Sequence, residues 1–135
     1  MRVADIMQTN VRTIYLDQMV ADAIALMAEL HVSGLPVVDE NERVVGVIST
    51  SDILQAEAES AGTDRRNLID NTPVSDLMTP RPLMVAPSAT VHEVAQQMLY
   101  GEVHRLFVED GGKMVGVVSQ TDLVRALATR REVVG

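Results

Sequence analysis

The feature that most limits what this chain can fold into is an internal repeat. The segment Val3-Ala4-Asp5-Ile6-Met7 returns as Val74-Ser75-Asp76-Leu77-Met78, 71 positions later. The spacing holds as far as Asp39 and Asp110 and becomes 70 positions after the turn that follows each of them. Turns accommodate such length changes, and a register kept over this distance indicates duplication of one structural unit. We therefore expect two copies of one fold.

The predicted organisation is a first repeat over residues 1–59, a linker over residues 60–73 and a second repeat over residues 74–130. The linker is polar, contains Gly62 and Pro73, and is too short to be a separate domain. With 135 residues in all, the chain has the size of one ordinary domain.

Each copy carries the hydrophobic patterns of a β-α-β-β-α unit. Apolar residues at helical spacing begin at Val20 and again at Val91, each after a short apolar stretch that is typical of a strand. Two further strands and a second helix follow in both copies. The expected strands are 11–16, 35–38 and 44–48, then 83–86, 106–108 and 114–118, and the expected helices are 20–31, 51–59, 91–99 and 121–130. This order predicts an α/β (α+β) fold in which each sheet is covered by its own helices.

The first helix of each copy has a different predicted start. Thr90 and Glu93 form a capping box in the second copy. The first copy has Met19 and Asp22 at these positions, so Asp17 or water is expected to replace the cap. Since aromatic residues make up only 2% of the chain, the core is expected to be aliphatic, with methionines on the apolar helix faces.

Composition and charge argue against several functions. A formal net charge of −8 disfavours binding to nucleic acid or anionic membranes, which requires a basic face. No apolar run is long enough to span a membrane, and the absence of cysteine gives no sign of secretion. His31, His92 and His104 lack metal-ligand spacing, and no catalytic motif is present. We therefore expect a cytoplasmic protein that is not an enzyme, with no metal site.

Polar residues recur where the last strand of each copy runs into its second helix. The residues are Ser49, Ser51 and Asp52 in the first copy, and Ser119, Thr121 and Asp122 in the second. A serine three positions before an aspartate caps a helix. The same groups also suit a nucleoside, because a carboxylate accepts hydrogen bonds from a ribose diol and helix amides hold phosphate. Both interpretations remain open at this point.

Together these motifs resemble the CBS-domain pair, or Bateman module, here as a small stand-alone protein. The resemblance rests on the two D-[IL]-M motifs, the Val32–Asp39 strand and the two G-V-[IV]-S-x-[ST]-D junctions. It implies two repeats packed about a pseudo-two-fold axis, with clefts that bind an adenosine nucleotide such as AMP, ADP or ATP, or else S-adenosylmethionine or NAD. It also implies a disc-like homodimer that regulates an effector protein and requires no cofactor.

The resemblance implies a ligand site in each repeat. In repeat 1 the matching residues are Thr13, Ile14, Gly34, Leu35, Pro36, Ser49, Ser51 and Asp52. In repeat 2 they are Met84, Val85, His104, Arg105, Leu106, Phe107, Ser119, Thr121 and Asp122. Asp52 and Asp122 match the ribose-binding acid of the family.

The two implied sites differ where Gly34-Leu35-Pro36 in the first copy becomes Arg105-Leu106-Phe107 in the second, after His104. An arginine can grip phosphate oxygens, and the His-Arg pair resembles the phosphate contacts of nucleotide-sensing relatives. A surface salt bridge for Arg105, a polar strand start for His104 and core filling by Phe107 are the alternatives. The predicted function is a regulatory nucleotide sensor whose main site is in repeat 2, and the alternative is a ligand-free dimerisation module.

Overall fold

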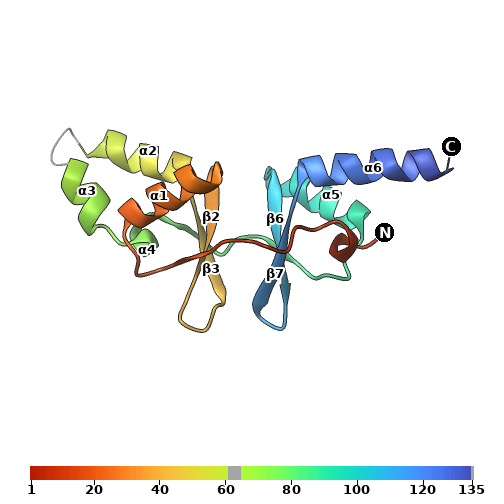
Figure 1. The fold of residues 1–135 in the computed structure, drawn as a ribbon, viewed down its shortest axis with the longest axis horizontal. Helices are drawn as coiled ribbons and strands as arrows, with labels where there is room; N and C mark the ends of the chain where they lie inside the picture. The colour runs from red at the N-terminus through yellow and green to blue at the C-terminus, as the bar shows by residue number, and fades with distance from the viewer. Residues whose placement is uncertain (61–64, 135) are drawn as a thin grey trace. The chain divides into compact units, whose positions relative to one another are not determined.

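The computed structural model describes residues 1–60 and 65–134, which form two compact units. The continuous unit is residues Arg12–Pro82. The split unit combines Met1–Val11 with Leu83–Gly135. Each unit therefore contains the strands and helices of one repeat. It also contains the D-[IL]-M motif that stands at the start of the other repeat. In Figure 1 the N-terminal segment accordingly lies with the last elements of the chain, not with the first strands.

The continuous unit has a four-stranded sheet in the order β1–β2–β3–β4. Its strands are β1 (Ile14–Tyr15), β2 (Gly34–Val38), β3 (Val44–Ser49) and β4 (Thr79–Pro80). β1 runs parallel to β2, whereas β3 is antiparallel to both of its neighbours. Its helices are α1 (Val20–Leu30), α2 (Thr50–Glu59), α3 (Arg65–Asn71) and α4 (Val74–Leu77).

The split unit repeats this arrangement with three strands, in the order β5–β6–β7. Its elements are the 3-10 helix η1 (Val3–Asp5), β5 (Met84–Val85), α5 (Val91–Gly101), β6 (Arg105–Asp110), β7 (Lys113–Ser119) and α6 (Gln120–Val134). The β-α-β-β-α order is thus confirmed in both copies (Figure 1). The first strand of each copy is only two residues long, shorter than predicted. The helix α3 within the linker was not predicted, and linker residues 61–64 lie outside the described part.

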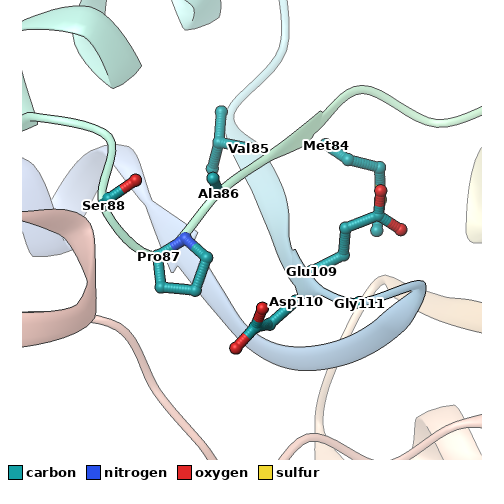
Figure 2. A pocket seen from close by; sticks show the side chains of 8 residues that line it. All are labelled: Met84, Val85, Ala86, Pro87, Ser88, Glu109, Asp110 and Gly111. Atoms are coloured by element: carbon teal, nitrogen blue, oxygen red, sulfur yellow. The ribbon is translucent and has the colours of Figure 1, made fainter.

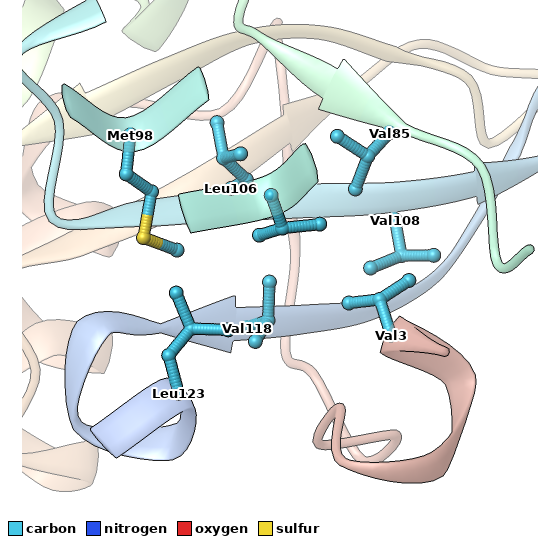
Figure 3. Close-up of a cluster of buried hydrophobic side chains, with 8 residues drawn as sticks. Val3, Val85, Met98, Leu106, Val108, Val118 and Leu123 are labelled. Carbon is cyan, nitrogen blue, oxygen red and sulfur yellow. The ribbon is translucent and has the colours of Figure 1, made fainter. Parts of the chain in front are cut away.

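Each unit has its own aliphatic core between one face of its sheet and its helices. In the split unit, Figure 3 shows Val85, Leu106, Val108 and Val118 of the sheet facing Met98 and Leu123 of α5 and α6. Val3 of the N-terminal segment completes this core and is fully buried. Val74, its counterpart 71 positions later, is equally buried in the core of the continuous unit. The predicted burial of methionines on the helix faces is confirmed by Met27 and Met98.

Replacing Val3 with alanine is therefore expected to loosen the split unit, although Val3 stands in the first repeat of the sequence. Removing two fully buried methyl groups costs about 2 kcal/mol of unfolding free energy. Hydrogen exchange should quicken at Val94 and Leu106 of the split unit. Val74→Ala is the matched control and should quicken exchange at Ile48 of the continuous unit instead. Faster exchange at Ile48 in the Val3 variant would contradict the assignment of the N-terminal segment.

The helix starts differ in part from expectation. The backbone amide of Met19 donates to the carboxylate of Asp22 over 3.0 Å, which is the return bond of a capping box. Met19 provides no side-chain cap, and the amides of Val20 and Asp22 donate to the backbone carbonyls of Thr72 and Met19, so Asp17 does not take the predicted role. At α5 the hydroxyl of Thr90 accepts the amide of Glu93 over 3.1 Å, as predicted. Within residues 1–60 and 65–134, the return bond from Glu93 is not formed.

Candidate functional site

The junction between β3 and α2 is a closed capping box. The Ser49 hydroxyl accepts the amide of Asp52 over 3.2 Å, and Asp52 Oδ2 accepts both the amide of Ser49 over 2.8 Å and its hydroxyl over 2.9 Å. These bonds satisfy amides that a helix start otherwise leaves without partners. They also explain why α2 begins at Thr50.

The junction between β7 and α6 has the same geometry in the split unit. Asp122 Oδ2 accepts the amide of Ser119 over 2.9 Å, and the Ser119 hydroxyl accepts the amide of Asp122 over 3.2 Å. Asp122 is only 7% exposed, and it is the one buried charged residue among those described. The capping interpretation is thus confirmed at both junctions. It occupies one oxygen of each carboxylate and leaves the other facing away from the cap.

That second oxygen, Oδ1, has only long contacts in both units. Asp52 Oδ1 lies 3.5 Å from the hydroxyl of Thr79. Asp122 Oδ1 lies 3.4 Å from the side-chain nitrogen Nε2 of Gln8 and 3.8 Å from Nη1 of Arg125. Good hydrogen bonds to a carboxylate are several tenths of an ångström shorter. The Oδ1 atoms therefore retain the capacity to accept a hydrogen bond from a ligand hydroxyl.

Strand register places Arg105 beside the Asp122 junction. Arg105 pairs with Ser119 across β6 and β7, and Ser119 caps the helix that carries Asp122. The Arg105 side chain is exposed, and within the described residues it forms no ion pair or side-chain hydrogen bond. The structure therefore gives no support to the salt-bridge alternative. The preceding residue, His104, is exposed, and its carbonyl accepts the amide of Gln120 at the start of α6 over 2.9 Å.

Alternation along the strands separates the predicted site residues into two groups. Val85 and Leu106 belong to the core of the split unit, and Ile14 and Leu35 belong to that of the continuous unit. Since their side chains are buried against helices, only their backbone can border a ligand. The opposite faces carry Met84, Arg105, Phe107 and Ser119 in one unit and Gly34, Pro36 and Ser49 in the other.

Three other predicted residues can be placed from their burial and position. Phe107 is 4% exposed, but it lies on the sheet face opposite the helices and outside the aliphatic core of the split unit, so its burial does not come from that core. Ser51 and Thr121 are exposed in the first turns of α2 and α6, one residue before each aspartate. Thr13 directly precedes β1. Ser51 and Thr121 thus lie at the strand–helix junctions, whereas Thr13 lies before the first strand of the continuous unit.

A separate hollow lies at the other end of the split unit's sheet. Figure 2 shows its lining from Met84 to Ser88 on one side and from Glu109 to Gly111 on the other. The same place in the continuous unit is lined by Tyr15–Asp17 and Val38–Asn41. Both hollows contain carboxylates, Glu109 and Asp110 in the first case. Because carboxylates repel phosphate, these hollows are poor nucleotide sites, and the junctions are the better candidates.

Sequence patterns did not predict that Gln8, Thr79 and Arg125 are neighbours of the two aspartates. The repeat does pair Gln8 with Thr79, one position after each D-[IL]-M motif. The two residues are also structurally equivalent, because Gln8 forms a β-bridge with Val117, and Thr79 pairs with Val47, at equivalent points of the two sheets. Arg125 corresponds to Gln55 in the first copy. Aligning the two repeats position by position, beyond the named motifs, would have pointed to these residues.

Residues 1–60 and 65–134 contain neither a cluster of metal ligands nor a helix that could span a membrane. No group of three histidine, cysteine, aspartate or glutamate side chains in this part is arranged to hold a metal ion. None of its helices combines the length and apolar character needed to cross a bilayer.

Comparison with known proteins agrees with the repeat and the fold. The sequence profile of the CBS domain matches twice, at residues 3–59 and 74–129. CBSX2, a chloroplastic CBS domain-containing protein of Arabidopsis thaliana, is 35% identical over 84% of this chain, which spans 57% of that protein. Protein MJ1426 of Methanocaldococcus jannaschii is 28% identical over 94% of this chain and 91% of its own length.

The fold is also found among solved structures. The crystal structure of CBSX2 in complex with AMP superposes with a TM-score of 0.82 and 33% identity, covering 96% of this chain and 98% of that one. The match extends over both repeats. The tandem units, the capped junctions and the two matches to the domain profile lead to one assignment, that this chain belongs to the CBS-domain family.

Proposed function

We propose that this chain is a regulatory module that binds an adenosine nucleotide, AMP, ADP or ATP, and changes the activity of a partner protein in response. The binding residues are those of the split unit's junction, with Asp122 on the ribose and Arg105 on the phosphate. The observation that carries the proposal is the position of Arg105, which is exposed and has no ion-pair partner among residues 1–60 and 65–134. It lies on the strand next to the one that leads into the buried Asp122, whose Oδ1 has only long contacts.

The chemistry of the two groups is complementary to a nucleotide. Oδ1 of Asp122 can accept a ribose hydroxyl, while Oδ2 keeps the helix start capped. In a chain with a net charge of −8, phosphate needs a local cation. The planar guanidinium of Arg105 suits two phosphate oxygens at once. Ser119 and Thr121 add hydroxyls in the same turn.

The continuous unit is the weaker candidate. Its junction has the same cap, but Gly34 stands in the place of Arg105, and Gln55 stands in the place of Arg125. Asp52 has no cation among its contacts in the described residues. We expect this junction to bind nucleosides weakly and to show little preference for a phosphate group.

Similarity to CBSX2 supports the adenosine class of ligand. That protein is 33% identical and was crystallised with AMP. Its structure aligns with 96% of this chain at a TM-score of 0.82, which supports the same class of ligand. We therefore place AMP first among the candidate nucleotides.

Calorimetric titration with AMP, ATP, adenosine and S-adenosylmethionine tests the proposal. Replacing Arg105 with methionine should weaken AMP binding about tenfold or more, since a charged hydrogen bond contributes roughly 1.5–3 kcal/mol. Adenosine, which lacks phosphate, should bind both proteins about equally. Arg43→Met removes an exposed arginine from a turn of the continuous unit and is the matched control, expected to leave both affinities unchanged.

Two results would contradict the proposal. Binding of none of the four compounds would remove the nucleotide function. An equal loss of AMP and adenosine affinity in the Arg105 variant would show that Arg105 does not read the phosphate.

The alternative function, a ligand-free dimerisation module, is favoured by the exposed apolar side chains of α5 and α6. Leu99 is 76% exposed, Tyr100 88%, Val124 65% and Leu127 58%. Large apolar groups gathered on exposed helices are typical of an interface. A dimer in light scattering, together with no heat from any of the compounds, would favour this function over nucleotide sensing.

A further inference from the structure

The side chain of Gln8 lies against the carboxylate that we assign to the ribose. Its amide nitrogen is 3.4 Å from Oδ1 of Asp122, although 114 positions separate the two residues. Its backbone is held firmly, because the amide of Gln8 donates to the carbonyl of Val117 and the amide of Val117 donates to the carbonyl of Gln8, each over 2.9 Å. Gln8 is thus fixed beside β7 with an exposed side chain free to adjust.

The cap limits what Asp122 can do alone. Oδ2 accepts the amide of Ser119 and points into the helix start. A ribose diol offers two neighbouring hydroxyls, each able to donate and to accept. When Oδ1 accepts one hydroxyl, a side chain beside it can bind the other and add a hydrogen bond. The Gln8 amide has both a donor and an acceptor, and it already lies within reach of the same oxygen.

We propose that Gln8 determines the specificity of the Asp122 site for ribonucleotides by binding the second hydroxyl of the ribose. In the free protein its amide rests on Oδ1 at a long distance. With a nucleotide bound, a ligand hydroxyl takes that place at the shorter distance of a charge-assisted bond, and the Gln8 amide turns to the neighbouring hydroxyl. This inference rests on the proposed nucleotide function and adds a residue from the opposite end of the chain to the site.

The equivalent position in the continuous unit supplies a comparison within the same molecule. Thr79 occupies the same place beside β3, and its hydroxyl lies 3.5 Å from Oδ1 of Asp52. A threonine hydroxyl is closer to its own backbone than a glutamine amide and cannot follow a ligand outward. The two junctions are therefore expected to differ in ribose selectivity as well as in phosphate binding.

The test compares AMP with 2′-deoxy-AMP in calorimetric titrations of the full chain. Wild type should prefer AMP. In Gln8→Ala, affinity for AMP should fall about three- to tenfold, the effect of one lost hydrogen bond, while affinity for 2′-deoxy-AMP stays the same, so that the preference disappears. Thr79→Ala is the matched control and should keep the wild-type preference.

A second variant covers the case in which alanine only loosens the N-terminal segment. Gln8→Glu keeps the size and the acceptor but brings a second negative charge to Asp122 and removes the donor, so it should weaken both ligands. An equal loss of AMP and 2′-deoxy-AMP affinity in Gln8→Ala, or an unchanged preference, would overturn the role of Gln8 while leaving nucleotide binding intact. Failure of wild type to bind either compound would overturn both proposals.

Discussion

Replacing Asp122 with alanine is expected to abolish AMP binding at the split unit, with a loss of about 100-fold or more in affinity. The side chain is buried, its Oδ1 is the acceptor that we assign to the ribose, and charge-assisted hydrogen bonds are the strong ones in such a site. The same change removes the return bond to the amide of Ser119, so unfolding free energy should also fall, by about 0.5–2 kcal/mol. Calorimetry and chemical denaturation measure the two effects separately.

Two control variants separate binding from capping. Asp122→Asn keeps an oxygen for the amide of Ser119 and should hold most of the stability, yet it should still bind AMP poorly because the charge is gone. Asp52→Ala loses the equivalent cap in the continuous unit and should lower stability by a similar amount while sparing the main AMP site. Unchanged AMP affinity in Asp122→Ala would mean that the aspartate is a helix cap and nothing more.

Replacing Gly116 with alanine is expected to destabilise the split unit by about 3 kcal/mol. A methyl group there would lie 2.6 Å from the sulfur of Met7 and 2.9 Å from the carbonyl oxygen of Gln8. The sulfur can move, but the carbonyl belongs to the backbone bridge between Gln8 and Val117. Overpacking and the loss of these two hydrogen bonds together give the expected size. Thermal or urea denaturation followed by circular dichroism checks it.

Gly101 provides the matched control for Gly116. A methyl group on Gly101 would come within 2.5 Å of a terminal carbon of Leu83, which is the far end of an exposed side chain and can rotate away. Gly101→Ala should therefore change stability by less than about 1 kcal/mol, because alanine also favours the end of α5. Similar losses in both variants would show that the N-terminal segment is not held against Gly116.

The fold was largely predictable from the repeat, but the pairing of segments was not. Helical and strand periodicities correctly predicted the β-α-β-β-α order in both copies. They do not indicate which D-[IL]-M motif packs on which sheet, because both copies of the motif carry a valine at the equivalent position, Val3 and Val74. That choice depends on chain geometry between the elements. The helix α3 was missed because Leu68 and Ile69 are only two apolar positions in a polar stretch.

The sequence allowed prediction of the residues at the candidate site, but not of their side-chain geometry. Serine and aspartate three positions apart at a strand–helix junction correctly predicted the cap at both junctions. Which carboxylate oxygen faces the helix and which remains available depends on side-chain geometry that spacing does not contain. Gln8 was missed because its contact with Asp122 joins opposite ends of the chain. Local patterns report on neighbours within a few residues.

We expect the split unit's junction to be the main nucleotide site and the continuous unit's junction to be secondary. Nuclear magnetic resonance titration of the labelled full chain with AMP tests this most directly, because each backbone amide reports its own surroundings. We expect the first and largest shifts at Arg105, Ser119 and Asp122, with later and smaller shifts at Ser49 and Asp52. Shifts confined to Ser49 and Asp52, or no shifts at either junction, would contradict it.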